Sequence, residues 1–207
     1  IDMARTSKVM KSIKLLSLQD ICDVDSLKES IMSTESVLEN NAQNYTHQNK
    51  ICTFLNNPPD FRGRNNIPHI LHKMIQFAQN AWDEANWSGT TEEPGPLYAI
   101  KGGIHELSIR VIEYWKYNVN GGLVDPYHLD TDSVLTIVCL LANEDEYTGG
   151  IFRTNEMNDI DLEHDMCVGD VICFISHKYH NITPLISGCR KSLVMELWQG
   201  GVGHEGR

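Results

Sequence analysis

The chain has 207 residues, of which 41% are hydrophobic and 22% are charged; these values fit one folded domain with a real core and exclude wholesale disorder. Seventeen basic residues stand against 28 acidic ones, and the formal net charge of -11 argues against a general nucleic-acid-binding protein. The longest apolar run, residues 134–142, is too short to span a membrane.

The six cysteines are an even number, which would allow a disulfide framework. Cys139 and Cys173 lie within strand-like apolar runs, where a free thiol packs as a small hydrophobic group. No CxxC pair is present, so the usual spacing of a zinc site is missing. We therefore expect free thiols. Because the chain starts at Ile1, we expect a trimmed N-terminus, which leaves cytoplasm and secretory-pathway lumen open as compartments.

Residues 1–66 predict a segment of helix and loop. The capping-box pattern that starts at Ser26 predicts a polar helix through about Val37, with Leu55 as its furthest end. The Asn- and Pro-rich stretch 56–60 predicts a loop.

Residues 67–103 predict a supporting helix followed by a long loop. Pro68 fits a first helical position, and apolar residues recur at helical spacing as far as Trp82. Residues 88–103 contain Pro-Gly-Pro and a glycine pair, which predict a loop. This loop is long enough to form a lid over a site, with the flanking Trp87 as a substrate contact.

From residue 104 onward the pattern changes to short strands. Stretches rich in β-branched and aromatic residues are separated by Gly-Gly or Gly-Asp pairs. The predicted strands are residues 105–117, 134–141, 171–175 and 192–197. Helices followed by many short strands predict a mainly β fold, a barrel or jelly roll with helices packed on the outside. We expect residues 104–199 to form this domain and residues 200–207 to form a tail.

Two of the nine histidines fall in a pattern typical of metal ligands. His128 and Asp130 are two residues apart, so on a strand their side chains would point to the same side. His180, after the predicted strand 171–175, supplies a second imidazole. Two histidines and one carboxylate hold Fe(II) and leave adjacent coordination positions open. His177 is the alternative distal ligand, because it follows the same strand directly.

Arg190 lies beyond His180 on the next predicted strand. Its rigid fork of N–H donors suits bidentate binding of a carboxylate. Ser192 shares its face by strand alternation and can add a hydroxyl. Lys191 is the alternative basic residue, but alternation places it on the opposite face from Ser192.

The order and spacing of these residues resemble the catalytic domain of Fe(II)/2-oxoglutarate-dependent oxygenases, most of all the prolyl 4-hydroxylase and procollagen lysyl hydroxylase branch. The resemblance covers about residues 104–199 and implies a double-stranded β-helix (jelly roll). Its motifs are Tyr117, Gly121-Gly122, His128-x-Asp130, Ser133, Thr136, Gly149-Gly150, Gly169-Asp170, His180, Pro184 and Gly188-x-Arg190.

The resemblance implies a role for each matched residue. The iron ligands would be His128, Asp130 and His180. Arg190 would pair with the distal carboxylate of 2-oxoglutarate, and Tyr117 would hydrogen-bond the same carboxylate. Thr136 faces the co-substrate region in some relatives, and Ser192 would lie beside Arg190. Leu140 stands where some relatives have a second tyrosine, so part of the polar contact is missing or supplied elsewhere.

The resemblance also implies the reaction. Iron(II), 2-oxoglutarate and O2 would hydroxylate a substrate C–H with release of succinate and CO2, and ascorbate would serve as a reductant. The branch acts mainly on prolyl or lysyl side chains in proteins, so the expected substrate is a peptide, and a free small molecule is the alternative. The alternative from another class is a jelly-roll or cupin module that binds a metal without redox chemistry.

Overall fold

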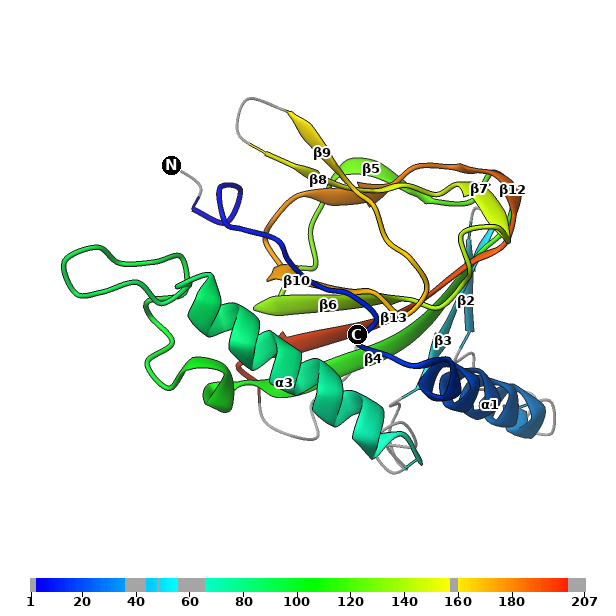
Figure 1. Cartoon of the computed structure of the whole chain (residues 1–207), viewed down its shortest axis with the longest axis horizontal. Coiled ribbons are helices and arrows are strands. Elements are labelled where there is room, and N and C mark those ends of the chain that lie inside the picture. Colours follow the sequence, from blue (N-terminus) through cyan, green and yellow to red (C-terminus); the bar gives the residue numbers. More distant parts are fainter. Residues whose placement is uncertain (1–2, 36–43, 48, 56–65, 157–159, 201–207) are drawn as a thin grey trace.

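The computed structural model describes residues 3–35, 44–47, 49–55, 66–156 and 160–200. Two antiparallel sheets face each other, and two helices cover the outer side of the larger sheet (Figure 1). The larger sheet has the strand order β1 (Met10–Ser12), β10 (Val171–Ile175), β6 (Leu135–Leu140), β13 (Arg190–Trp198), β4 (Ser108–Tyr117), β3 (Lys50–Phe54) and β2 (Asn44–His47). The predicted mainly β fold with helices outside is confirmed.

The smaller sheet lies on the opposite side of the larger sheet from the helices (Figure 1). Its strand order is β5 (Leu123–His128), β11 (His180–Ile182), β8 (Phe152–Asn155) and β9 (Asp161–His164). A further strand pair joins β7 (Tyr147–Gly149) to β12 (Leu185–Gly188). The division of the chain into four segments at residues 66, 103 and 199 stays a prediction.

The larger sheet is covered on both faces, so its central strands are apolar at nearly every position. All six residues of β6 are buried. Ile137 and Cys139 of this strand pack toward the helices together with Leu193 of β13, whereas Val138 packs between the sheets against Phe152. Strand alternation therefore separates an outer core, under the helices, from an inner core between the two sheets.

Helix α3 (Pro68–Glu84) has the predicted start and extends two residues past Trp82. It buries one apolar stripe against the outer face of the larger sheet. The buried residues are Ile70, Leu71, Met74, Ala78, Ala81 and Trp82. This stripe makes α3 the main cover of the outer core.

Helix α1 (Leu18–Glu35) begins earlier than the predicted start at Ser26. Ser17 and Asp20 form the actual cap: Asp20 accepts the Ser17 backbone N–H at 2.7 Å, and Ser17 Oγ accepts the Asp20 backbone N–H at 3.2 Å. The extension of this helix to Leu55 was wrong, because residues 50–54 form strand β3. The predicted helix end at Val37 and the predicted loop at 56–60 lie outside the described residues.

Residues 88–102 form turns without a regular helix or strand, as predicted, and the short 3-10 helix η1 (Gly103–Glu106) follows. The expected role of Trp87 as a substrate contact was wrong. Its side chain is 1% exposed and belongs to the outer core, with its ring edge-to-face to Trp82. No residue of this loop lines the site cavity described below.

All six cysteines are free thiols, as expected, and Cys52, Cys139 and Cys173 are buried. Within the described part of the chain, neither helix combines the length and the apolar character needed to cross a membrane.

Candidate active site

Three side chains converge at one end of the inner core. His128 ends β5 and lies directly opposite His180, the first residue of β11. Asp130 Oδ1 lies 3.0 Å from His128 Nε2, and Asp130 Oδ2 lies 3.5 Å from His180 Nε2. One nitrogen or oxygen from each residue falls within 4.8 Å of the others. The predicted triad is therefore assembled with geometry that can hold a single metal ion.

Asp130 reaches this position from a turn and not, as expected, from the strand itself, because β5 stops at His128. Its backbone N–H donates to the Ser176 carbonyl at 3.2 Å, and its own carbonyl accepts the Ser133 N–H at 3.3 Å. Thr136 Oγ1 donates to Asp130 Oδ2 at 2.6 Å. These bonds fix a carboxylate that is only 8% exposed.

The ring of His180 is oriented by its backbone neighbour. His180 Nδ1–H donates to the carbonyl of Lys178 at 3.0 Å, which leaves Nε2 as the nitrogen that faces Asp130. Phe174 and Phe152 pack around the imidazole with ring-centroid distances of 4.8 and 5.9 Å. His180 is therefore buried with a defined tautomer, as a metal ligand needs to be.

The protonation states of Asp130 and His180 suit metal binding. Burial lowers the pKa of His180, so its ring is neutral at neutral pH. Burial alone would raise the pKa of Asp130, but the nearby His180 and the hydrogen bonds from His128 and Thr136 outweigh it and lower that pKa to about 2. The carboxylate is therefore ionised and the imidazole neutral, which are the forms that coordinate a cation.

The two alternative residues lie outside the site. His177 is exposed, in contrast to the buried His180. Lys191 points away from the inner core, and its ammonium lies 3.9 Å from Asp25 of α1. Both predicted preferences, for His180 and for Arg190, agree with this placement.

Arg190, at the start of β13, is 1% exposed. In the described part of the chain its Nε and Nη1 have no hydrogen-bond partner and the guanidinium forms no ion pair. The guanidinium lies 5.8 Å from the centroid of the Tyr117 ring and lines a cavity of about 120 Å³ next to the triad cavity, with Phe152 bordering both. A buried cation without a counter-ion costs several kcal/mol, so this arrangement favours an anionic ligand.

Tyr147 brings a tyrosine side chain to the small cavity that Arg190 lines. Leu140 is fully buried, and Tyr147 lines the same small cavity as Arg190. Burial raises the pKa of Tyr147, whereas the charge of Arg190 and a hydrogen bond with it act in the opposite direction. No sequence pattern pointed to Tyr147, because it lies on the three-residue strand β7.

Gly150 makes room for the Arg190 side chain. It has φ +62, and a Cβ at this position would lie 3.0 Å from Arg190 Cδ. A side chain at Gly150 would therefore be strained in the backbone and would also displace the guanidinium.

Of the other residues predicted to bind the co-substrate, two line the large cavity described below and one lines neither cavity. Tyr117 and Ser192 both line the large cavity, and the buried Ser192 hydroxyl has no hydrogen-bond partner among the residues that the structure describes. Burial raises the pKa of Tyr117, while Arg190 opposes that shift. Thr136 does not line either cavity, because its hydroxyl bonds Asp130 and Ser176.

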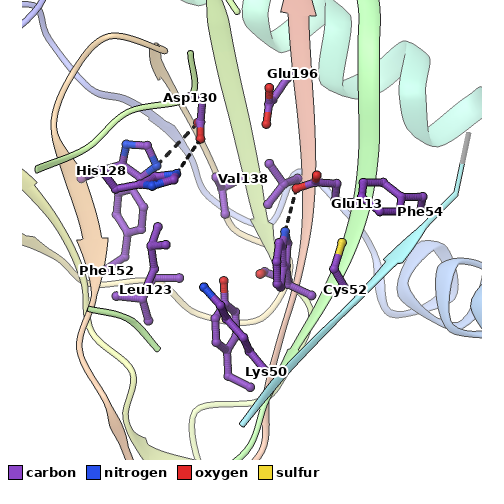
Figure 2. Close-up of a pocket in the computed structure, with 16 residues that line it drawn as sticks. Lys50, Cys52, Phe54, Glu113, Leu123, His128, Asp130, Val138, Phe152 and Glu196 are labelled. Carbon is purple, nitrogen blue, oxygen red and sulfur yellow. Dashed lines mark hydrogen bonds and ion pairs between the residues drawn. The ribbon is translucent and has the colours of Figure 1, made fainter. Parts of the chain in front are cut away.

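The large cavity, of about 620 Å³, extends from the triad across the larger sheet to β3. Figure 2 shows His128 and Asp130 on one side and Glu113, Phe54 and Cys52 on the other. The cavity is lined by Lys50, Cys52, Phe54, Glu113, Trp115, Tyr117, Leu123, His128, Asp130, Val138, Phe152, His180, Ile182, Ser192, Val194 and Glu196. It offers space beside the triad for more than one small ligand.

Sequence reasoning missed the acidic residues on the wall of this cavity. Glu113 is 2% exposed and accepts the Trp115 indole N–H at 2.8 Å. Glu196 is 1% exposed and accepts from Arg110 at 2.7 Å and from Ser133 at 2.6 Å, which ties the turn after Asp130 to β13. Strand alternation could have pointed to both glutamates. Glu113 shares a strand face with Tyr117, and Glu196 shares one with Ser192.

Solved structures share this architecture over nearly the whole chain. A prolyl-4-hydroxylase from Pseudomonas putida superposes with a TM-score of 0.58 at 15% identity, covering 97% of both chains. An oxidoreductase of the 2OG-Fe(II) oxygenase family from Burkholderia pseudomallei gives 0.60 at 13% identity, covering 96% of this chain and 88% of that one. The chain has the fold of the 2-oxoglutarate–Fe(II) oxygenases. The predicted double-stranded β-helix is thereby confirmed.

A third structure with the oxygenase fold is a viral collagen prolyl hydroxylase from Paramecium bursaria Chlorella virus-1 in a 2OG complex. It has a TM-score of 0.56 at 11% identity and covers 91% of this chain and 94% of its own. No protein-family model and no curated protein sequence matches the chain. The similarity is therefore one of fold, joined to the His128, Asp130 and His180 triad.

The residues present fit both groups that this fold implies. Two imidazoles and one carboxylate are the ligand set that holds Fe(II) with open positions. The buried guanidinium of Arg190, without an ion pair in the described residues, and the unpartnered hydroxyl of Ser192 are polar atoms that a carboxylate ligand would satisfy.

The pH dependence of stability tests the buried His180 and the half-buried His164. Burial lowers the pKa values of His180 and His164 below their ordinary value of 6.5. Below pH 6.5 the unfolded chain therefore binds more protons than the native one, and these two groups make the metal-free protein less stable as the pH falls. Urea denaturation with a chelator should give a smaller loss between pH 7.5 and 5.5 for His164→Gln than for the unmodified protein. An equal loss in both proteins would contradict the assignment.

Proposed function

We propose that the protein is an Fe(II)- and 2-oxoglutarate-dependent dioxygenase that hydroxylates a C–H bond of its substrate. The observation that carries the proposal is the pairing, within one inner core, of the His-Asp-His triad with a buried arginine that lacks a carboxylate partner among the described residues. A triad alone would serve any metal site. The buried guanidinium of Arg190 lines the small cavity next to the triad cavity, where a carboxylate ligand would neutralise its charge.

The protein's own groups have separate tasks in this proposal. His128, Asp130 and His180 would hold the iron, and Arg190 would bind the distal carboxylate of 2-oxoglutarate. When bound, iron and 2-oxoglutarate supply the oxidation, in which O2 converts 2-oxoglutarate to succinate and CO2 and places one oxygen atom on the substrate.

The surrounding residues orient these groups and exclude water. The Lys178 carbonyl fixes the tautomer of His180, and the Thr136 hydroxyl fixes one oxygen of Asp130. Phe152 and Val138 form apolar walls next to the triad. These apolar walls would strengthen the electrostatic contacts and keep the oxidation on the bound substrate.

The substrate we assign is a prolyl residue of a peptide. Three observations support this assignment. The fold is shared with prolyl hydroxylases, and one of them, from Trichoplax adhaerens, was solved with a peptide fragment of hypoxia inducible factor. The third observation is that the cavity beside the triad is large. A lysyl residue is the second candidate, because the carboxylate of Glu113 lines the cavity wall and would attract an ammonium group.

Peptide libraries with prolyl or lysyl residues provide the test. With Fe(II), 2-oxoglutarate and ascorbate present, mass spectrometry should detect a gain of one oxygen atom on a subset of peptides, with succinate formed in equal amount. Omission of 2-oxoglutarate should remove the gain. Modification of free small molecules alone would move the assignment away from peptides, and a gain of oxygen that persists without 2-oxoglutarate would contradict the dioxygenase.

A non-redox jelly-roll or cupin module is the competing function. Such a module needs only the triad, so it leaves the buried Arg190 unexplained. Anaerobic addition of Fe(II) and 2-oxoglutarate separates the two functions, because chelation of the iron by the keto acid gives a weak visible absorption band. A metal-binding module without a keto-acid co-substrate would show no such band.

A further inference from the structure

The N-terminal segment, residues 3–12, packs against the loop that carries His180. Its strand β1 adds to the edge of the larger sheet by pairing with β10, which leads into that loop. In Figure 1 the segment runs from the marked N-terminus alongside β10. Residues far apart in the sequence are thus brought together next to the metal triad.

Lys178 lies at the centre of this contact and is 0% exposed. Its ammonium donates to the carbonyl of Arg5 at 2.5 Å, to the carbonyl of Ser7 at 3.0 Å and to Glu156 Oε2 at 2.8 Å. An ammonium has three N–H donors, so this set satisfies all of them. A buried lysine is costly unless it is paired in this way, which makes the arrangement specific.

The backbone of Lys178 takes part in the site as well. Its carbonyl accepts the Nδ1–H of His180 at 3.0 Å, so the residue that anchors the N-terminal segment also sets the ring orientation of a triad member. Partners of this type around metal-binding histidines usually contribute 10- to 100-fold in metal affinity, as an order of magnitude.

Arg5 strengthens the same connection from the N-terminal side. Its guanidinium donates to Asn155 Oδ1 at 2.5 Å and to the Glu156 carbonyl at 3.2 Å, and it lies 5.1 Å from the centroid of the Tyr179 ring. Tyr179 in turn packs edge-to-face on Tyr127, the neighbour of His128. The segment therefore supports the residues that flank both histidines of the triad.

We propose that Lys178 is a positioning residue of the metal centre, which couples docking of the N-terminal segment to the orientation of His180. The inference rests on the proposed function only in that the triad binds a metal. It goes beyond that function because it assigns metal retention to a segment more than 100 residues away in sequence from the triad.

Co(II) binding, followed by visible absorption, tests the proposal with the full chain. The variant Lys178→Met removes the charge and keeps the stem, and Lys8→Met is the matched control, because Lys8 lies in the same segment with an exposed side chain. We expect Co(II) affinity to fall about 10-fold or more in Lys178→Met, with a changed absorption spectrum, and to stay unchanged in Lys8→Met. Arg5→Ala, which leaves the buried lysine in place, should weaken binding in the same direction by less.

The melting temperature of the metal-free variants separates positioning from general stability. If Lys178→Met and Arg5→Ala lower this temperature but bind Co(II) with unchanged affinity and spectrum well below it, the positioning role is overturned. If Lys178→Met does not fold, unchanged Co(II) binding by folded Arg5→Ala overturns the role by itself. If the unmodified protein binds no Co(II), the proposed function fails instead, which distinguishes the two outcomes.

Discussion

Replacement of Asp130 by alanine should abolish 2-oxoglutarate-dependent succinate formation. It should also weaken metal binding by more than about 100-fold, because loss of a ligand itself costs more affinity than loss of a ligand's hydrogen-bond partner. Asp130 is the only carboxylate of the triad, and it lies between the two imidazoles. Its loss leaves two imidazole ligands without a carboxylate, which hold Fe(II) poorly. Succinate release and metal content after dialysis are the two measurements.

The fold should survive this change, because Asp130 lies in a turn at the end of the inner core. Far-UV circular dichroism and the melting temperature verify this. The matched control is Asp132→Asn: Asp132 is two residues further along the chain, its side chain is 79% exposed, and asparagine tolerates its φ of 68°. Normal turnover in Asp130→Ala would refute the triad, as would an equal loss in Asp132→Asn.

The second large effect concerns the 2-oxoglutarate requirement. Arg190→Ala removes the charge-assisted hydrogen bonds proposed for the distal carboxylate, each of which contributes about 1.5–3 kcal/mol. We expect the concentration of 2-oxoglutarate needed for half-maximal rate to rise by ~10- to 150-fold, whereas the requirement for the hydroxylated substrate changes little. Steady-state kinetics with each of the two varied in turn measures both values.

Lys191→Ala serves as the control for Arg190→Ala. Lys191 is the next residue on the same strand, carries the same charge and points to the opposite side, toward Asp25. It should leave the 2-oxoglutarate requirement unchanged. An unchanged requirement in Arg190→Ala would show that another group binds the distal carboxylate.

The central strands of the larger sheet could be predicted from the sequence because both of their faces are buried. Continuous apolar runs, such as those of β6 and β10, are then the expected pattern. Helix α3 was predictable for a similar reason, since its apolar residues follow the helical period. In these elements local sequence and tertiary burial agree.

The smaller sheet could not be predicted, because its strands are short and their burial depends on partners far away in the chain. β11 has three residues, and β9 is mostly exposed. Strand β3 was mistaken for part of a helix. Its residues are buried because the strand pairs with β4, and the local sequence does not show that pairing. Its cavity residues Lys50 and Cys52 were missed for the same reason.

The clustering of the triad and the burial of Arg190 could be expected because their spacing along the chain is characteristic. The contacts that support these residues could not be predicted. The Thr136 hydrogen bond to Asp130 and the contacts of Lys178 join segments that only the fold brings together. Tyr147 and the two buried glutamates likewise depend on strand pairing. Sequence spacing therefore singled out three side chains that the fold brings together, and tertiary structure was needed to find their surroundings.

A crystal structure grown anaerobically with Fe(II) and 2-oxoglutarate tests the central claim most directly. Anomalous diffraction at the iron edge should show one metal ion bound by His128 Nε2, His180 Nε2 and the Asp130 carboxylate, with the distal carboxylate of 2-oxoglutarate on Arg190. A metal ion elsewhere, or 2-oxoglutarate bound away from the guanidinium of Arg190, would contradict it.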